Sequence, residues 1–139
     1  DMVENHKMVA ENSGLLTVAA LKHLDVKGKN VVSIISGGNM DIITMSSVVQ
    51  QGLIFRDRIF TVSVLLPDKP GELSRVSGMI ANENGNVIKL EHNQFVSTNR
   101  NMTVELRITL EAFGTEHKNQ IIDALERESY RPRLVQTNI

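Results

Sequence analysis

Hydrophobic and polar residues alternate with a period of two in the second half of the chain. The longest such run extends from Met102 to Glu111, where apolar side chains at even positions alternate with Thr, Glu and Arg at odd positions. This alternation predicts a strand with one buried and one solvent-exposed face. The same period predicts a strand over Ile59–Leu66 and another over about 86–97, with Ile88 and Leu90 on one face.

Two helices are predicted between these strands. Leu73, Val76 and Ile80 have helical spacing after Pro70, with Asp68 placed as a cap and Asn84-Gly85 as the end. A second apolar stripe over about 115–128 comprises Ile121, Ala124 and Leu125, and Thr115 is a plausible cap.

Residues 99–101 read as a hairpin turn, and Pro132 makes the last strand an edge strand. The order strand-helix-strand-strand-helix-strand predicts an α+β, ferredoxin-like domain with two helices on one face of an antiparallel sheet.

The first half has a different pattern. Residues 13–24 are apolar on nearly all sides and favour a buried helix, and residues 31–35 form a β-branched run typical of a strand covered on both faces. Gly37-Gly38 ends that strand, and a helix follows from Asp41, with Asn39 or Asp41 at its N-cap. Because one strand cannot form a parallel sheet, this helix-strand-helix fragment should leave apolar surface uncovered. Partner chains or a sheet upstream in a longer protein would cover it.

Composition narrows the function classes. The formal net charge is -1 and the 15 Lys and Arg are scattered, so no nucleic-acid surface is expected. There is no cysteine, and no apolar run is long enough to span a membrane. The four histidines lack metal-ligand spacing, so no metal site is expected. A soluble, cytoplasmic protein is the default expectation, because Asp1 is not followed by a signal-like segment.

Ser36-Gly37-Gly38-Asn39 lies where ligands bind in open α/β sheets, at the carboxyl end of the predicted strand. The simpler interpretation is a tight strand-to-helix connection. With Glu11-Asn12-Ser13-Gly14, however, this turn resembles the end of the catalytic domain of threonine dehydratases, which share the pyridoxal-phosphate fold of serine dehydratases and serine racemase. The resemblance implies that the Ser36 hydroxyl bonds the pyridine nitrogen of the cofactor. It implies a cofactor site formed by Glu11, Ser36, Gly37, Gly38 and Asn39.

The family's Schiff-base lysine and its phosphate-binding glycine loop have no counterpart in this chain. We therefore expect no catalytic residue, no bound pyridoxal phosphate and no dehydratase activity in the chain alone, although the resemblance implies this cofactor in the full-length enzyme.

The turn Asp68-Lys69-Pro70-Gly71-Glu72-Leu73, followed by Gly85-Asn86-Val87, resembles the ACT domain, a small-molecule sensor of amino-acid metabolism. Such domains usually pair, and an amino acid often binds between two copies. The resemblance implies an effector site formed by Asp68, Lys69, Pro70, Gly71, Glu72 and Leu73 of one copy, with Asn86, Val87 and Ile88 opposite. Alternatively, Asp68 only caps the helix and Gly71 only forms the turn.

These resemblances predict the regulatory C-terminal region of a threonine dehydratase. Residues 1–57 would be the incomplete end of the catalytic domain and residues 58–139 the ACT domain. The expected partners are an amino-acid effector, isoleucine or valine from the pathway, and further copies of the chain in a dimer or larger homo-oligomer. Three alternatives stay open: a stand-alone amino-acid-sensing or dimerisation module, the same region of a serine dehydratase or racemase, and a degradative enzyme with a nucleotide activator or with no effector.

Overall fold

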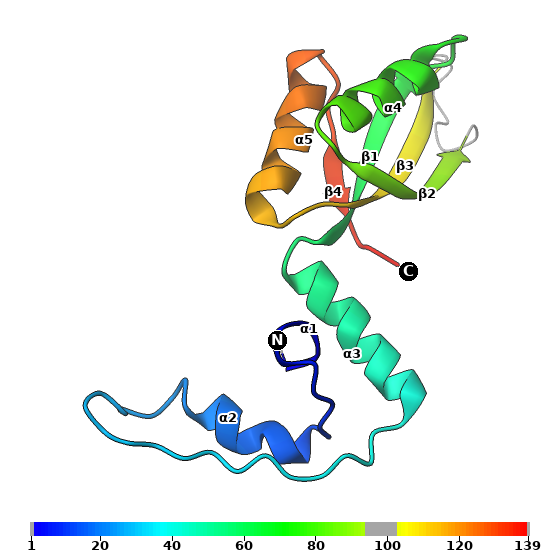
Figure 1. The fold of residues 1–139 in the computed structure, drawn as a ribbon. Coiled ribbons are helices and arrows are strands. Elements are labelled where there is room, and N and C mark those ends of the chain that lie inside the picture. Colours follow the sequence, from blue (N-terminus) through cyan, green and yellow to red (C-terminus); the bar gives the residue numbers. More distant parts are fainter. Residues whose placement is uncertain (1, 94–102, 139) are drawn as a thin grey trace. The chain divides into compact units, whose positions relative to one another are not determined.

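The computed structural model describes residues 2–93 and 103–138. Its internal contacts separate two compact units, Asp1–Val48 and Val49–Ile139 (Figure 1). The boundary lies within a helix, so the last part of that helix belongs to the second unit.

Short helices and irregular segments make up the first unit. They are α1 (Met2–His6), the 3-10 helix η1 (Ser13–Leu15), α2 (Leu16–Ala20) and the beginning of α3 (Ile42–Phe55). The helix predicted over 13–24 is therefore shorter and ends in turns after Ala20. Asp41 caps α3 as predicted, because its Oδ2 accepts a hydrogen bond from the Thr44 N–H at 3.1 Å.

The predicted strand over 31–35 is wrong, because residues 29–41 form neither helix nor strand. A strand is held by hydrogen bonds to a neighbouring strand, and the described residues of this unit provide no such neighbour. The β-branched composition favours an extended conformation but cannot supply the pairing.

The expectation of uncovered apolar surface in this region is confirmed. Among its described residues only Ala10 and Gly14 are buried, whereas Val32 is 89% exposed and Ile42 76% exposed. Further exposed apolar side chains are Leu16, Leu24, Val31, Ile34, Ile35 and Ile43.

The second unit contains a four-stranded antiparallel sheet of order β2-β3-β1-β4 (Figure 1). Its elements follow the chain as β1 (Ile59–Pro67), α4 (Glu72–Asn82), β2 (Asn86–Asn93), β3 (Thr103–Glu111), α5 (Thr115–Arg127) and β4 (Arg133–Val135). This order and strand arrangement confirm the predicted ferredoxin-like fold. Pro132 precedes β4 at the sheet edge, as predicted.

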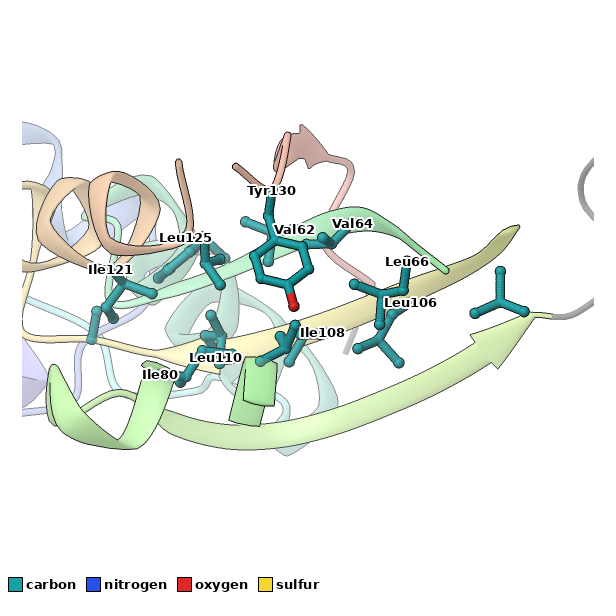
Figure 2. Packing of buried hydrophobic residues seen from close by; sticks show 14 residues of the cluster. Val62, Val64, Leu66, Ile80, Leu106, Ile108, Leu110, Ile121, Leu125 and Tyr130 are labelled. Carbon is teal, nitrogen blue, oxygen red and sulfur yellow. The ribbon is translucent and has the colours of Figure 1, made fainter. Parts of the chain in front are cut away.

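The core lies between the sheet and both helices. The even-numbered residues of β1 and β3 pack against Val76 and Ile80 of α4 and against Ile121 and Leu125 of α5 (Figure 2). Tyr130, which follows α5, completes this cluster. The opposite face is not simply solvent-exposed as predicted, because Thr61, Ser63, Glu105 and Thr109 are also buried there.

Two predicted helix caps are wrong. The N-cap of α4 is Gly71, with φ of 94° and no side-chain cap, because the turn after Pro67 separates Asp68 from the helix. The N-cap of α5 is Gly114, and the Thr115 hydroxyl instead donates to Asp57. The predicted end of α4 is confirmed: Asn84 has a φ of 61°, and the Gly85 N–H donates to the Ile80 carbonyl.

The predicted hairpin turn at 99–101, residues 94–97 of the second predicted strand and Met102 lie outside the described residues.

Candidate functional site

The predicted cofactor turn lies against the segment that contains Glu11. The Glu11 N–H donates to the Gly37 carbonyl at 3.2 Å, and the Thr17 hydroxyl donates to the Ile34 carbonyl at 2.9 Å. A Cβ atom at Gly14 would collide with the carbonyl oxygen of Ser36. Glycine at position 14 therefore permits the close approach of these two segments.

Gly37 adopts a left-handed conformation, with φ of 77°, and the Glu11 side chain occupies the space that a Cβ there would fill. The Glu11 carboxylate also accepts a hydrogen bond from the Ser13 hydroxyl at 2.7 Å. The structure thus brings Glu11 and Gly37 together, although they are far apart in sequence.

Ser36 precedes Gly37, whereas Gly38 and Asn39 follow it, and these three residues are exposed. All five residues of the predicted cofactor site therefore belong to one local structure. Their role toward a cofactor stays a prediction.

The predicted effector turn after β1 is open to solvent. Residues 68–71 are exposed, and the left-handed Gly71 has no atom within 4 Å of where a Cβ would lie. Among the described residues, the backbone N–H groups of Leu73 and Ser74 make no backbone hydrogen bond. Free N–H groups at a helix start suit a carboxylate.

Within this turn, the side chain of Glu72 contacts two other side chains. Its Oε2 accepts a hydrogen bond from the Tyr130 hydroxyl at 2.8 Å, and its Oε1 lies 3.7 Å from a guanidinium nitrogen of Arg75. Burial, and then the bond to Glu72, raise the pKa of Tyr130. Sequence reasoning missed Tyr130. Tyr130 is the only tyrosine of the chain and follows the helix predicted over about 115–128. A single tyrosine at that place could have indicated a side chain with both an apolar and a polar contact.

The other half of the predicted effector site begins an exposed edge strand. Asn86 donates to the Glu111 carboxylate at 3.2 Å, while Val87 and Ile88 are exposed apolar residues. The pairing of β2 with β3 shifts register between Val87 and Lys89. β2 also carries the exposed ion pair of Lys89 and Glu91, and its unpaired edge is a surface to which another strand can add.

One chain does not bring the two halves together. Pro67 pairs with Thr103 at the start of β3, whereas Asn86 pairs with Glu111 at its end. At the usual rise of about 3.3 Å per residue, these ends lie roughly 26 Å apart. A site that uses both halves therefore needs two copies.

The sheet face opposite the helices carries a polar network that the sequence did not reveal. The Ser63 hydroxyl donates to Glu105 at 2.6 Å, and the Thr61 and Thr109 hydroxyls are 3.0 Å apart. The bond from Ser63 lowers the pKa of Glu105, and Arg107 Nε lies 3.2 Å from its other oxygen. These contacts link β1 to β3 across the face opposite the helices, while Glu105 Oε2 is buried and forms no hydrogen bond among the described residues.

The described residues contain no cluster of three or more His, Asp or Glu side chains that could hold a metal ion. None of the helices within them has the length and apolar character needed to cross a membrane.

No family model matches the chain. Over 135 residues, or 96% of its length, the chain is 33% identical to an L-threonine ammonia-lyase of Thermotoga maritima, of which it covers 34%. It is also 33% identical to the L-threonine ammonia-lyase of Geobacter sulfurreducens, covering 93% of this chain and 33% of that protein. The chain thus spans about a third of the length of the curated relatives it matches, and corresponds to their C-terminal part. These matches confirm the predicted resemblance to threonine dehydratases.

Two solved structures show weaker likeness. The ACT domain of a prephenate dehydrogenase from Bacillus anthracis aligns with 52% of this chain and 99% of its own length, at 23% identity and a TM-score of 0.41. An unknown protein from Galdieria sulphuraria aligns with 93% of this chain and 94% of its own length, at 17% identity and a TM-score of 0.45. The strand order β2-β3-β1-β4 of this chain is itself that of a ferredoxin-like sheet.

Proposed function

We propose that this chain is the regulatory C-terminal region of a threonine ammonia-lyase, which converts L-threonine to 2-oxobutanoate and ammonia. The observation that carries the proposal is the similarity to L-threonine ammonia-lyases over nearly the whole chain, confined to a third of their length. Residues 1–57 would complete the catalytic domain, and residues 58–139 would form an ACT domain.

The exposed apolar side chains of the first unit support this division. The exposure of Val32, Ile34 and Ile42 to water is unfavourable. A larger domain that includes this unit would bury these side chains. A segment such as 31–35 would gain its pairing from strands that belong to the rest of that domain.

Pyridoxal phosphate would supply the electron sink for elimination when bound to the intact enzyme. The residues present fit a supporting part of its site, because Ser36 is an exposed residue of a turn that contacts Glu11 and Gly14. A neutral hydroxyl at the ring nitrogen would leave that nitrogen largely unprotonated. Because the chain has no lysine in the context of the family's Schiff base, we propose that it is inactive alone.

The effector site would form between two copies. If the β2 strands of two copies paired antiparallel about a two-fold axis, Asn86 of one copy would lie beside the C-terminal end of β2 in the other. In that second copy, the C-terminal end of β2 pairs with β3 near Thr103. Thr103 in turn pairs with Pro67, which directly precedes the effector turn. Edge pairing therefore unites the two halves that a single chain keeps apart.

The chemistry of these two halves fits a small amino acid with an apolar side chain. The free N–H groups of Leu73 and Ser74 would receive its carboxylate, and Asp68 or Asn86 would accept from its ammonium group. Val87 and Ile88 would contact its side chain, which favours isoleucine or valine over serine.

Calorimetric titration of the 139-residue chain with isoleucine, valine, threonine and serine tests the proposal. We expect saturable binding of isoleucine or valine that is lost in Gly71→Leu, since the left-handed turn cannot keep its shape with a leucine. Gly78→Ala is the matched control, because Gly78 lies within α4 with no atom near its missing Cβ. No binding of any of the four would favour a purely dimerising module.

Sedimentation tests the pairing separately. We expect a dimer or larger species that Ile88→Lys weakens, because the lysine places like charges at the paired edge. A monomer at tens of micromolar would contradict the pairing whatever the calorimetry shows.

A further inference from the structure

We infer that α5 couples the effector turn to the turn that precedes β1, through Tyr130 at its C-terminal end and Asp57 at its N-terminal end. The inference rests on the proposed function, in which residues 68–73 hold the effector, and adds the route by which binding there reaches α3.

The C-terminal end of α5 is tied to the effector turn. Ser129, with φ of 67°, and Tyr130 close the helix by donating to the carbonyls of Glu126 and Leu125. This closure fixes the backbone of Tyr130, whose ring is buried in the core (Figure 2). Its hydroxyl then bonds Glu72, the first residue of α4 and a member of the effector turn.

The N-terminal end of α5 is tied to the turn before β1. Both carboxylate oxygens of Asp57 accept hydrogen bonds from the first turn of α5: Oδ2 from the Thr115 hydroxyl at 2.7 Å and Oδ1 from Lys118 Nζ at 2.8 Å. The side chains of Lys118 and Asp57 are 13% and 26% exposed, so this ion pair is partly shielded from solvent. The Lys118 bond, followed by the Thr115 bond, lowers the pKa of Asp57, which keeps it charged.

Asp57 also belongs to the turn that closes the C-terminal end of α3 after Phe55. It adopts a left-handed conformation, with φ of 54°, and its N–H donates to the Ile54 carbonyl while the Arg58 N–H donates to Leu53. The Arg58 carbonyl accepts from the Ala112 N–H at 2.8 Å. The end of α3 therefore cannot reorient without breaking the Asp57 contacts or carrying α5 with it.

A single rigid element thus touches both turns. α5 has 13 residues and a length of about 20 Å at 1.5 Å per residue, and Ile121 and Leu125 hold it in the core. An effector that shifts Glu72 would change the Tyr130 bond at one end, and α5 would pass the change to Asp57. Tyr130 and Asp57 are positioning residues in this scheme, because neither is placed to contact the effector.

Amide hydrogen exchange of the 139-residue chain, resolved residue by residue, tests the coupling without any effector. We expect Tyr130→Phe to raise exchange at Asp57 and Arg58 by about threefold or more, and Asp57→Asn to do the same at Arg75, whose N–H donates to Gly71. Exchange in the middle of β3 measures the global loss of stability in each variant. The coupling predicts a local rise at Asp57, Arg58 and Arg75 that this global loss does not account for, whereas a merely structural effect would appear only as the global loss.

Arg127→Gln is the control, since it removes the exposed α5 pair with Glu83 and reaches neither turn. Glu72→Gln replaces Tyr130→Phe if the latter does not fold. A change confined to the mutated end in both variants overturns the inference.

Saturation of the wild-type chain with isoleucine then separates the two proposals. If the variants change exchange at the opposite end of α5 but isoleucine does not bind the wild-type chain, the coupling stands and isoleucine is not the effector. Isoleucine binding that leaves exchange at Asp57 and Arg58 unchanged would overturn the coupling and leave the sensor function in place.

Discussion

The two units differ in what their apolar side chains meet. In the second unit, Leu106 and Ile108 are completely buried, because the same chain supplies a sheet and two helices to enclose them. In the first unit, Val32 and Ile42 are equally apolar and almost fully exposed. Apolar composition therefore does not determine burial. A core forms where the chain itself provides every layer around it.

The largest expected effect tests the closed core of the second unit. We expect Leu106→Ala to lower the free energy of unfolding by about 3 kcal/mol, because it leaves a cavity at the centre of β3. Urea unfolding followed by the fluorescence of Tyr130, the only tyrosine in a chain without tryptophan, measures it. A loss below about 1 kcal/mol would mean that this core is less tightly packed than described.

A smaller effect is expected where the second unit fixes the end of α3. Asp57→Asn should cost about 1–2 kcal/mol at neutral pH, because Lys118 and Thr115 lose a charged acceptor. The folded pKa of Asp57 lies below its ordinary value of 3.8, so its contribution is present above that pH and lost as the pH falls through the folded pKa. Urea unfolding across pH should show the wild type and the variant converging in acid. A difference that persisted there would contradict an ionic origin.

The effector turn should give a still smaller effect on stability. We expect Gly71→Ala to cost about 1 kcal/mol, because alanine is strained at a φ of 94° although space is available. Gly78→Ala, inside α4, should instead stabilise by about 0.5–1 kcal/mol. Equal effects of the two variants in thermal unfolding would show that the left-handed conformation is not required.

The smallest effect is expected in the first unit. Leu16→Ser should change the free energy of unfolding by less than about 0.5 kcal/mol, because Leu16 is already 66% exposed. The far-ultraviolet circular dichroism melt of the chain measures it beside Leu106→Ala. A loss comparable to that of Leu106→Ala would reveal that Leu16 has a partner in solution and would remove the contrast between the units.

Sequence patterns predicted what is local in this molecule. The alternation over 103–111 and the helical spacing of Val76 and Ile80 are visible in the sequence itself, and the four-stranded fold followed from the order of these elements. β3 also has its neighbours β1 and β2 within the same chain. The strand prediction for residues 31–35 was wrong, because the described residues of the first unit contain no neighbouring strand. The β-branched residues of this segment encode an extended preference, but a strand exists only with a neighbour to pair with.

The site residues show the same limit. Thr115 was predicted as a cap from its own neighbourhood, but its hydroxyl binds Asp57, 58 residues earlier in the chain. The Tyr130–Glu72 bond spans the same separation and has no local signature. Glu11 and Gly37 were associated only through the family resemblance, since no periodicity indicates that their backbones meet.

The two edges of the sheet have unequal capacity to recruit another chain. β2 offers eight residues with exposed Val87 and Ile88, whereas β4 has three residues and follows Pro132, which cannot donate a hydrogen bond. If two copies join through β2, each pairing consumes the longer of the two edges among the described strands, and the short β4 edges that remain cannot extend the assembly. Growth along the sheet would then stop at a closed pair, which protects an exposed edge strand from polymerising into fibrils.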